Sequence, residues 1–264
     1  MMPAIKMKEE YFTLNRSYPI SCKRYLPDDL PIHTAVLGVH GFAGDKESSM
    51  LRFLAEDLTR KNAALISFDF PGHGNSPLSG DFLTIENCVS DLKFMIRYCM
   101  EQFPLAEHCL FATSFGGFIA LLSNETLLLN HYRAVLRAPA VNMPELFLPM
   151  IGLSKEEYRL RNRVNCGFPG EREILVPFAF YEELQNYDLS ALDYLPMHYL
   201  VIHGEKDDLV PYAAVRQFCE TINNRDREHP CFDLHALPSA DHRFKGPGEM
   251  DEIVRTAEEY WKIS

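Results

Sequence analysis

The most informative stretch of this sequence is Cys109-Leu110-Phe111-Ala112-Thr113-Ser114-Phe115-Gly116-Gly117. The apolar residues before Ser114 predict a buried strand, and the apolar run at 118–122 predicts a helix directly after it. A serine on so tight a strand-to-helix turn has a strained backbone, and its hydroxyl lies clear of the sheet. The residues two before and two after it, Ala112 and Gly116, are small, as this turn requires. The stretch therefore follows the G-x-S-x-G pattern of a nucleophilic serine, with alanine in place of the first glycine.

Continuous apolar runs alternate with amphipathic segments along the rest of the chain. Residues 35–39 and 63–70 are typical of strands buried on both faces, and residues 84–103 carry apolar side chains at helical spacing. Two short runs, 11–14 and 20–26, predict an antiparallel hairpin at a sheet edge. Further elements are predicted as strands at 134–136, 199–202 and 231–237, a helix from about Pro211, and a last helix ending near Trp261. This alternation predicts an α/β fold with a doubly wound, mostly parallel, eight-stranded sheet flanked by helices.

One segment, residues 143–190, interrupts the alternation because it is richer in proline, arginine and aromatic residues. In a doubly wound sheet the reactive groups gather at the carboxyl ends of the strands. We therefore expect a single domain over residues 1–264, in which residues 143–190 form a lid or cap at that edge. Four arginines of the segment fit a solvated face better than a site for a substrate carboxylate: Arg159, Arg161, Arg163 and Arg172.

A serine hydroxyl needs a base that takes its proton, and the base works best when an acid fixes its tautomer. In folds of this kind the acid and the histidine follow the serine along the chain. Asp207 lies just past the strand at 199–202 and is the predicted acid, with Asp208 as its competitor. His242 lies in the loop directly after the last predicted strand and is the predicted base.

Two backbone N–H groups are predicted to bind the oxyanion that forms when the serine attacks a carbonyl. One belongs to Phe115, directly after Ser114, and the other to Phe42, in the loop after the strand at 35–39. Gly41 and Gly44 allow the backbone of that loop to approach a substrate closely. The turn at 71–76 is predicted to be structural and to shape the floor of the pocket.

The formal net charge of −11 argues against a nucleic-acid partner or an anionic membrane surface, because both require concentrated lysine and arginine. The sequence has no run of bilayer length and no apolar core of a signal peptide near its start. Seven cysteines without a C-x-x-C pair are typical of free thiols in a reducing compartment. We therefore expect a cytoplasmic protein that needs no metal or other cofactor, and the sequence leaves a homo-oligomer open.

Together these motifs resemble those of the α/β-hydrolase superfamily, from about residue 9 to the C-terminus. The resemblance is carried by residues 40–42, 69–76, 113–117, 204–207 with 210–211, and 241–242. The chain is similar in particular to the group of bacterial cinnamoyl and feruloyl esterases, monoglyceride-lipase-like enzymes and serine aminopeptidase-like proteins. The stretch 161–181 is similar to the compact insertion of the esterase branch. The resemblance implies the following roles: Ser114 as nucleophile, His242 as base, Asp207 as acid, and Phe42 and Phe115 as oxyanion donors.

The expected function is the hydrolysis of a small-molecule carboxylic ester through an acyl-enzyme, by a serine esterase. Cleavage of an amide or a thioester by the same residues is the alternative within the superfamily. A catalytically silent scaffold used for binding is an alternative of another class, although such a scaffold usually lacks a member of the triad. A cofactorless haloperoxidase or lyase that uses the same triad is also open.

Overall fold

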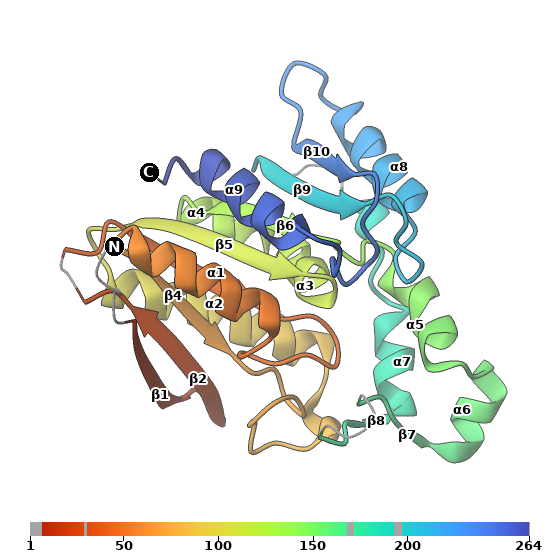
Figure 1. Cartoon of the computed structure of the whole chain (residues 1–264). Helices are drawn as coiled ribbons and strands as arrows, with labels where there is room; N and C mark the ends of the chain where they lie inside the picture. The colour runs from red at the N-terminus through yellow and green to blue at the C-terminus, as the bar shows by residue number, and fades with distance from the viewer. Residues whose placement is uncertain (1–6, 29–30, 168–171, 193–196, 264) are drawn as a thin grey trace.

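The computed structural model describes residues 7–28, 31–167, 172–192 and 197–263. Its centre is one eight-stranded sheet with the strand order β1-β2-β4-β3-β5-β6-β9-β10 (Figure 1). The strands are β1 Lys8–Asn15, β2 Pro19–Leu26, β3 Thr34–Val39, β4 Ala63–Phe68, β5 Glu107–Thr113, β6 Arg133–Arg137, β9 Tyr199–Gly204 and β10 Phe232–Leu237. The pairs β1–β2 and β2–β4 are antiparallel, and the other pairs are parallel. The predicted eight-stranded, mostly parallel sheet with an antiparallel hairpin at one edge is therefore confirmed.

Helices cover both faces of this sheet, as predicted (Figure 1). The helices around the sheet are α1 Ser49–Arg60, α2 Ile85–Gln102, α3 Phe115–Leu122, α4 Asn124–Leu129, α8 Tyr212–Asn223 and α9 Glu249–Trp261. Within β5, Leu110 belongs to the core with α2, α3 and α8, whereas Phe111 belongs to the core with α1 and α9. Alternate strand residues point to opposite faces, so the continuous apolar runs of the sequence supply both cores.

The segment between β6 and β9 contains regular structure of its own. It consists of α5 Met143–Ile151, α6 Lys155–Arg161, β7 Arg163–Asn165, β8 Leu175–Pro177, α7 Phe178–Leu184 and a 3₁₀ turn at Leu189–Ala191. The strands β7 and β8 pair antiparallel in a small second sheet, and residues 168–171 between them lie outside the described residues. Figure 1 shows this segment to one side of the main sheet, beyond the carboxyl ends of the central strands.

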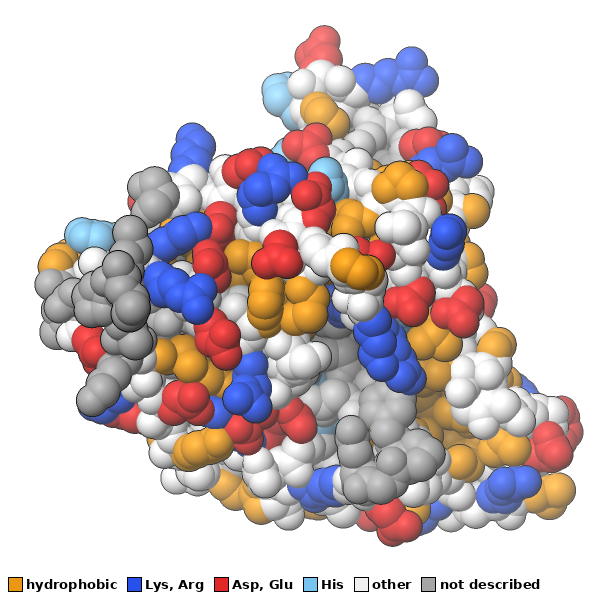
Figure 2. Space-filling model, viewed as in Figure 1, with side chains coloured by type: hydrophobic (Ala, Val, Ile, Leu, Met, Phe, Trp, Pro, Cys, Tyr) orange, Lys and Arg blue, Asp and Glu red, His pale blue; other side chains and the backbone are white. Residues whose placement is uncertain are grey.

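On the face shown in Figure 2, acidic and basic side chains are interspersed in small groups. None of the helices in the described ranges combines the length and the hydropathy needed to cross a membrane.

All seven cysteines carry free thiols.

Candidate active site

Ser114 directly follows β5 and occupies the N-cap position of α3, where its side chain makes no capping hydrogen bond. Its φ of 50° lies in the left-handed region, which a side-chain-bearing residue adopts only when its surroundings enforce it. Two backbone hydrogen bonds do so: the N–H of Ser114 donates to the carbonyl oxygen of Arg137 (2.9 Å), and the N–H of Ala140 donates to the carbonyl oxygen of Ser114 (3.1 Å). The strained turn expected at this serine is therefore present.

Close contacts around Ser114 explain why Gly116 and Gly41 have no side chains. A Cβ atom on Gly116 would lie 2.6 Å from the carbonyl oxygen of His40, and a Cβ atom on Gly41 would lie 3.2 Å from the Cβ atom of Ser114. Ala112, which replaces the first glycine of the pattern, is fully buried in the core beside α2 and α3. The fold has room for this one methyl group, whereas it has none at Gly116.

Asp207 and His242 meet at the carboxyl ends of β9 and β10. The Nδ1 atom of His242 lies 2.7 Å from Oδ2 of Asp207. Because an ionised carboxylate can only accept, His242 carries its proton on Nδ1, and its Nε2 atom is left to act as a base. The other oxygen of Asp207 accepts the backbone N–H groups of Leu209 (3.0 Å) and Val210 (2.7 Å). Asp208, the competing carboxylate, is exposed.

The charge of Asp207 is stabilised by its hydrogen bonds. Burial acts to raise the pKa of this carboxyl, but hydrogen bonds from His203, His242 and the Val210 N–H outweigh it and hold the pKa well below its usual range. His203 was not singled out in the sequence. Its Nε2 atom lies 2.9 Å from the carbonyl oxygen of Val210 and 3.2 Å from Oδ2 of Asp207, so this nitrogen is the protonated one. The only sequence signal is its place at the end of β9, four residues before Asp207.

Ser114 and His242 line one cavity of about 890 Å³, and Phe42 lines the same cavity. The wall comes from the β3–α1 loop, the start of α1, the ends of β5 and β6, and the β10–α9 loop. Asp207 lies behind His242, and Phe115 is buried at the start of α3. The structure thus brings the predicted site residues together. No described residue of 143–190 lines this cavity, so a lid formed by that segment stays a prediction.

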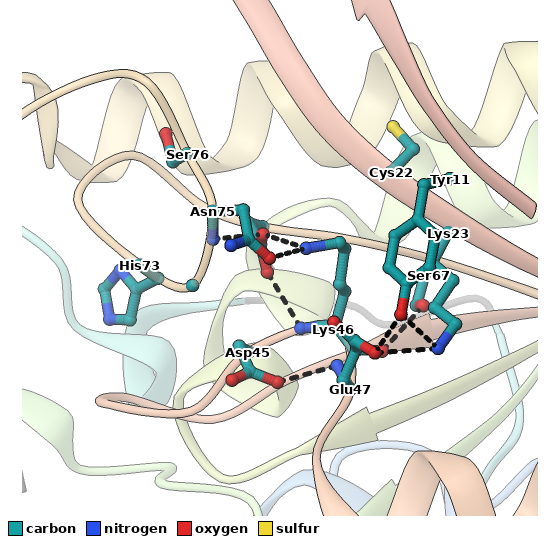
Figure 3. Close-up of polar contacts among 12 residues, drawn as sticks. Tyr11, Cys22, Lys23, Asp45, Lys46, Glu47, Ser67, His73, Asn75 and Ser76 are labelled. Atoms are coloured by element: carbon teal, nitrogen blue, oxygen red, sulfur yellow. Dashed lines mark hydrogen bonds and ion pairs between the residues drawn. The ribbon is translucent and has the colours of Figure 1, made fainter. Parts of the chain in front are cut away.

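The β3–α1 loop, which carries Phe42, is tied to the loop after β4 by a buried ion pair between Lys46 and Asp69. Figure 3 labels Lys46 and its second partner, Asn75. The Nζ atom of Lys46 lies 2.7 Å from Oδ2 of Asp69 and 2.7 Å from Oδ1 of Asn75. The backbone N–H of Lys46 donates to the other oxygen of Asp69 (2.8 Å), and the hydroxyl of Ser67 donates to the Lys46 carbonyl oxygen (2.8 Å). These contacts fix the loop at a fully buried point.

The turn at 71–76 and the segment at 143–190 pack around the same loop. Arg172 donates to the carbonyl oxygens of Gly74 (2.7 Å) and Ser76 (2.7 Å), so it holds the turn. The residue is exposed, as expected for a solvated face, and it makes these backbone contacts in addition. The ring of Phe42 packs against other aromatic rings with centroid distances of 5.5 to 6.0 Å: His73, Phe115, Phe147 and Phe180. Phe147 and Phe180 of the segment therefore pack directly against the side chain of Phe42 in this loop.

Comparison with known proteins identifies relatives of this chain. The profile of the family described as serine aminopeptidase, S33, matches residues 31–170, which is more than half of the 264 residues. No curated protein sequence matches the chain.

Solved structures with the same fold were found over nearly the whole chain. The mouse α/β hydrolase domain-containing protein 10 shares 19% identity with a TM-score of 0.74, and the match covers 96% of this chain and 98% of that chain. Est1E from Butyrivibrio proteoclasticus, with bound ferulic acid, shares 18% identity with a TM-score of 0.77, over 92% of this chain and 95% of that chain. The Pyrococcus furiosus esterase Pf2001 shares 17% identity with a TM-score of 0.69, over 98% and 92%. At these identities the likeness establishes the α/β-hydrolase fold.

Proposed function

This chain belongs to the serine aminopeptidase S33 family of α/β hydrolases, and we propose that within it the protein cleaves carboxylic esters through an acyl-enzyme. The observation that carries the proposal is the 2.7 Å contact between Asp207 and His242, because His242 lines the same cavity as Ser114. A strained serine, a histidine with a fixed tautomer and a buried carboxylate are the three parts that acyl transfer to serine requires.

In the proposed reaction, the Oγ atom of Ser114 attacks the ester carbonyl while Nε2 of His242 takes its proton. The tetrahedral intermediate then expels the alcohol, which receives that proton from His242, and the acyl group stays on Ser114. Water then attacks the carbonyl carbon of the acyl group while His242 removes its proton. The acyl–oxygen bond to Ser114 breaks as His242 returns this proton to Oγ of Ser114, and the carboxylic acid leaves. Asp207 stays ionised throughout and stabilises the imidazolium of His242.

The negative charge on the carbonyl oxygen needs preorganised donors. We assign this role to the backbone N–H groups of Phe42 and Phe115. Phe115 is the first residue of α3, so the positive end of that helix adds to its donor. The buried pair of Lys46 and Asp69 supports the proposal for Phe42, because it anchors the loop that carries this N–H group.

An ester substrate is supported by the two esterases among the structural neighbours, although the family itself is described by an aminopeptidase. Cleavage of an amide is therefore the second candidate. Both reactions use the same residues, so the substrate must be decided by measurement.

The first experiment is labelling with a fluorophosphonate probe, which reacts only with an activated serine. The wild type is compared with Ser114→Ala and with Ser49→Ala, a control at an exposed serine of the same cavity wall. We expect labelling of the wild type and of the control, and none of Ser114→Ala, whose kcat falls by about 10⁴- to 10⁶-fold. A folded wild type that does not label would favour a silent scaffold.

The second experiment compares kcat/KM for aryl esters of graded acyl length, the matching thioesters, and aminoacyl 4-nitroanilides. The proposal predicts turnover of the esters, with a preferred acyl length set by the cavity. Turnover confined to the nitroanilides would replace the ester assignment with the aminopeptidase one.

A further inference from the structure

Arg137 is the last residue of β6 and lines the cavity together with Ser114 and His242. Its backbone oxygen accepts the N–H of Ser114, so the side chain starts directly beside the nucleophile. The residue is only 6% exposed, although it carries a guanidinium group. Burying a charged group without polar partners costs a large free energy, so a buried guanidinium is expected to have such partners.

The structure gives this guanidinium few partners. Nη2 donates to the carbonyl oxygen of His242 (3.2 Å), and the group lies over the ring of Phe244 at 4.4 Å from its centroid. The Nε atom is buried without a hydrogen-bond partner among the described residues, and no ion pair is formed by Arg137 within those ranges. Burial lowers the pKa of the guanidinium to about 10, against the opposing charges of Asp207 and Asp241.

The surrounding wall is also positive. Arg243 and Lys245 line the same cavity, and Asp251 is the single acidic residue among its described lining residues. The first turn of α1 lies in the wall as well. That turn contains no acidic residue, and the side chain of its N-cap, Ser48, makes no capping hydrogen bond. Its N–H groups therefore add to the positive potential. This local excess contrasts with the net charge of −11 of the whole chain.

We propose that the cavity recognises a carboxylate on the substrate, with Arg137 as its principal partner. The preferred substrates are then esters that carry a free carboxylate in addition to the ester group that is cleaved. A substrate carboxylate would add the direct ion pair and the planar acceptor that this guanidinium does not have among the described residues, where Asp207 and Asp241 act on it only as nearby charges. The inference rests on the proposed esterase function and names the substrate class of the same site. The carboxylate belongs to the acyl group or to the alcohol, and the test distinguishes the two.

The test uses two pairs of esters that differ only in charge. The acyl pair is 4-nitrophenyl hydrogen glutarate and its methyl ester; the alcohol pair is 4-carboxyphenyl butyrate and its methyl ester. We expect the wild type to have a kcat/KM at least about 10-fold higher for the anionic member of one pair. The pair that shows this preference identifies the half of the substrate that carries the carboxylate.

The variants are Arg137→Gln and Arg137→Lys, with Arg52→Gln on the exposed side of α1 as the control. In Arg137→Gln the ratio of anionic to neutral kcat/KM should fall about 10- to 100-fold, because a hydrogen-bonded ion pair with the substrate is lost. Arg137→Lys should retain part of the ratio, and Arg52→Gln all of it. Equal losses for both members of a pair would mean that Arg137 only positions His242, and would overturn the proposal.

Binding of glutarate to the wild type, measured by calorimetry, keeps the test independent of turnover and of the folding of the variants. Glutarate should bind and should inhibit competitively, whereas 1,5-pentanediol, a neutral molecule with the same carbon chain and no ester bond, should not. If no ester is cleaved but glutarate binds the wild type and not Arg137→Gln, the esterase function fails and the carboxylate site stands. A wild type without charge preference that also fails to bind glutarate would refute the carboxylate site.

Discussion

At the scale of single residues, the Asp207 carboxylate is the side chain of the candidate site whose position is fixed by four polar contacts. Its two oxygens accept hydrogen bonds from two backbone N–H groups and two histidines. Each of these bonds favours the ionised form, and together they overcome the cost of burial. The carboxylate is therefore built to remain charged beside His242.

Asp207→Asn tests whether this charge serves catalysis. The amide keeps the shape of the side chain but lets His242 adopt the wrong tautomer, so kcat should fall by about 10⁴-fold, as it does for the corresponding aspartate of a serine protease. Asp208→Asn, which removes the same charge from the exposed neighbour, should retain most of the activity. Steady-state kinetics on one aryl ester measures both. A similar loss in the two variants would contradict the assignment of Asp207.

The sequence singled out Asp207 because it follows a buried strand in the chain order of serine hydrolases. It did not indicate His203 or Arg137, although both lie next to the predicted residues. Each stands at the end of an apolar run, where a polar residue is expected in any strand of this fold. Their importance comes from contacts with residues far along the chain, and local pattern does not reveal such contacts.

At the scale of elements, the loop between β3 and α1 depends on the buried pair of Lys46 and Asp69. Their side chains are 1% and 0% exposed. Burial of two charges costs several kcal/mol per ion and is repaid only when the remaining donors and acceptors are satisfied. Here Asn75 and the Lys46 backbone complete the arrangement.

Lys46→Met should lower the free energy of unfolding by about 3–5 kcal/mol, because it leaves the carboxylate of Asp69 buried without a counter-charge. The control is Lys8→Met, which removes an exposed ion pair with Glu10 and should cost at most about 1 kcal/mol. Urea unfolding measures both values. A cost for Lys46→Met no larger than that of the control would show that Asp69 is satisfied without the lysine.

The elements of the main sheet could be predicted to within a few residues, but those of residues 143–190 could not. The sheet strands are continuous apolar runs, and α2 is long enough at 18 residues to show its helical spacing. By contrast, α6 and α7 have 7 residues each, β7 and β8 have 3 each, and α5 contains Pro149. Elements this short owe their stability to packing against the aromatic residues around Phe42, and packing is invisible in a local pattern.

At the scale of the whole molecule, Asp91 connects the β1–β2 hairpin at the edge of the sheet to helix α2 by hydrogen bonds. This α2 residue accepts hydrogen bonds from Nε of Arg16 (3.0 Å) and the hydroxyl of Tyr18 (2.8 Å), both in the β1–β2 hairpin. Its second oxygen has no partner among the described residues. Burial raises the pKa of Asp91 to about 6, although Tyr18 and Arg16 act to lower it. The folded protein therefore holds this proton more tightly than the unfolded chain does.

A carboxyl with a raised folded-state pKa contributes stability that is present below its unfolded value, here near 3.8, and is lost as the pH rises through about 6. Asp91→Asn keeps the shape but cannot ionise, so its free energy of unfolding relative to the wild type should rise by about 2–3 kcal/mol between pH 4 and pH 7. Urea unfolding at both pH values measures the change, with Asp208→Asn as an exposed control of equal charge. A difference between Asp91→Asn and the wild type that is the same at both pH values would mean that Asp91 is already ionised at pH 4.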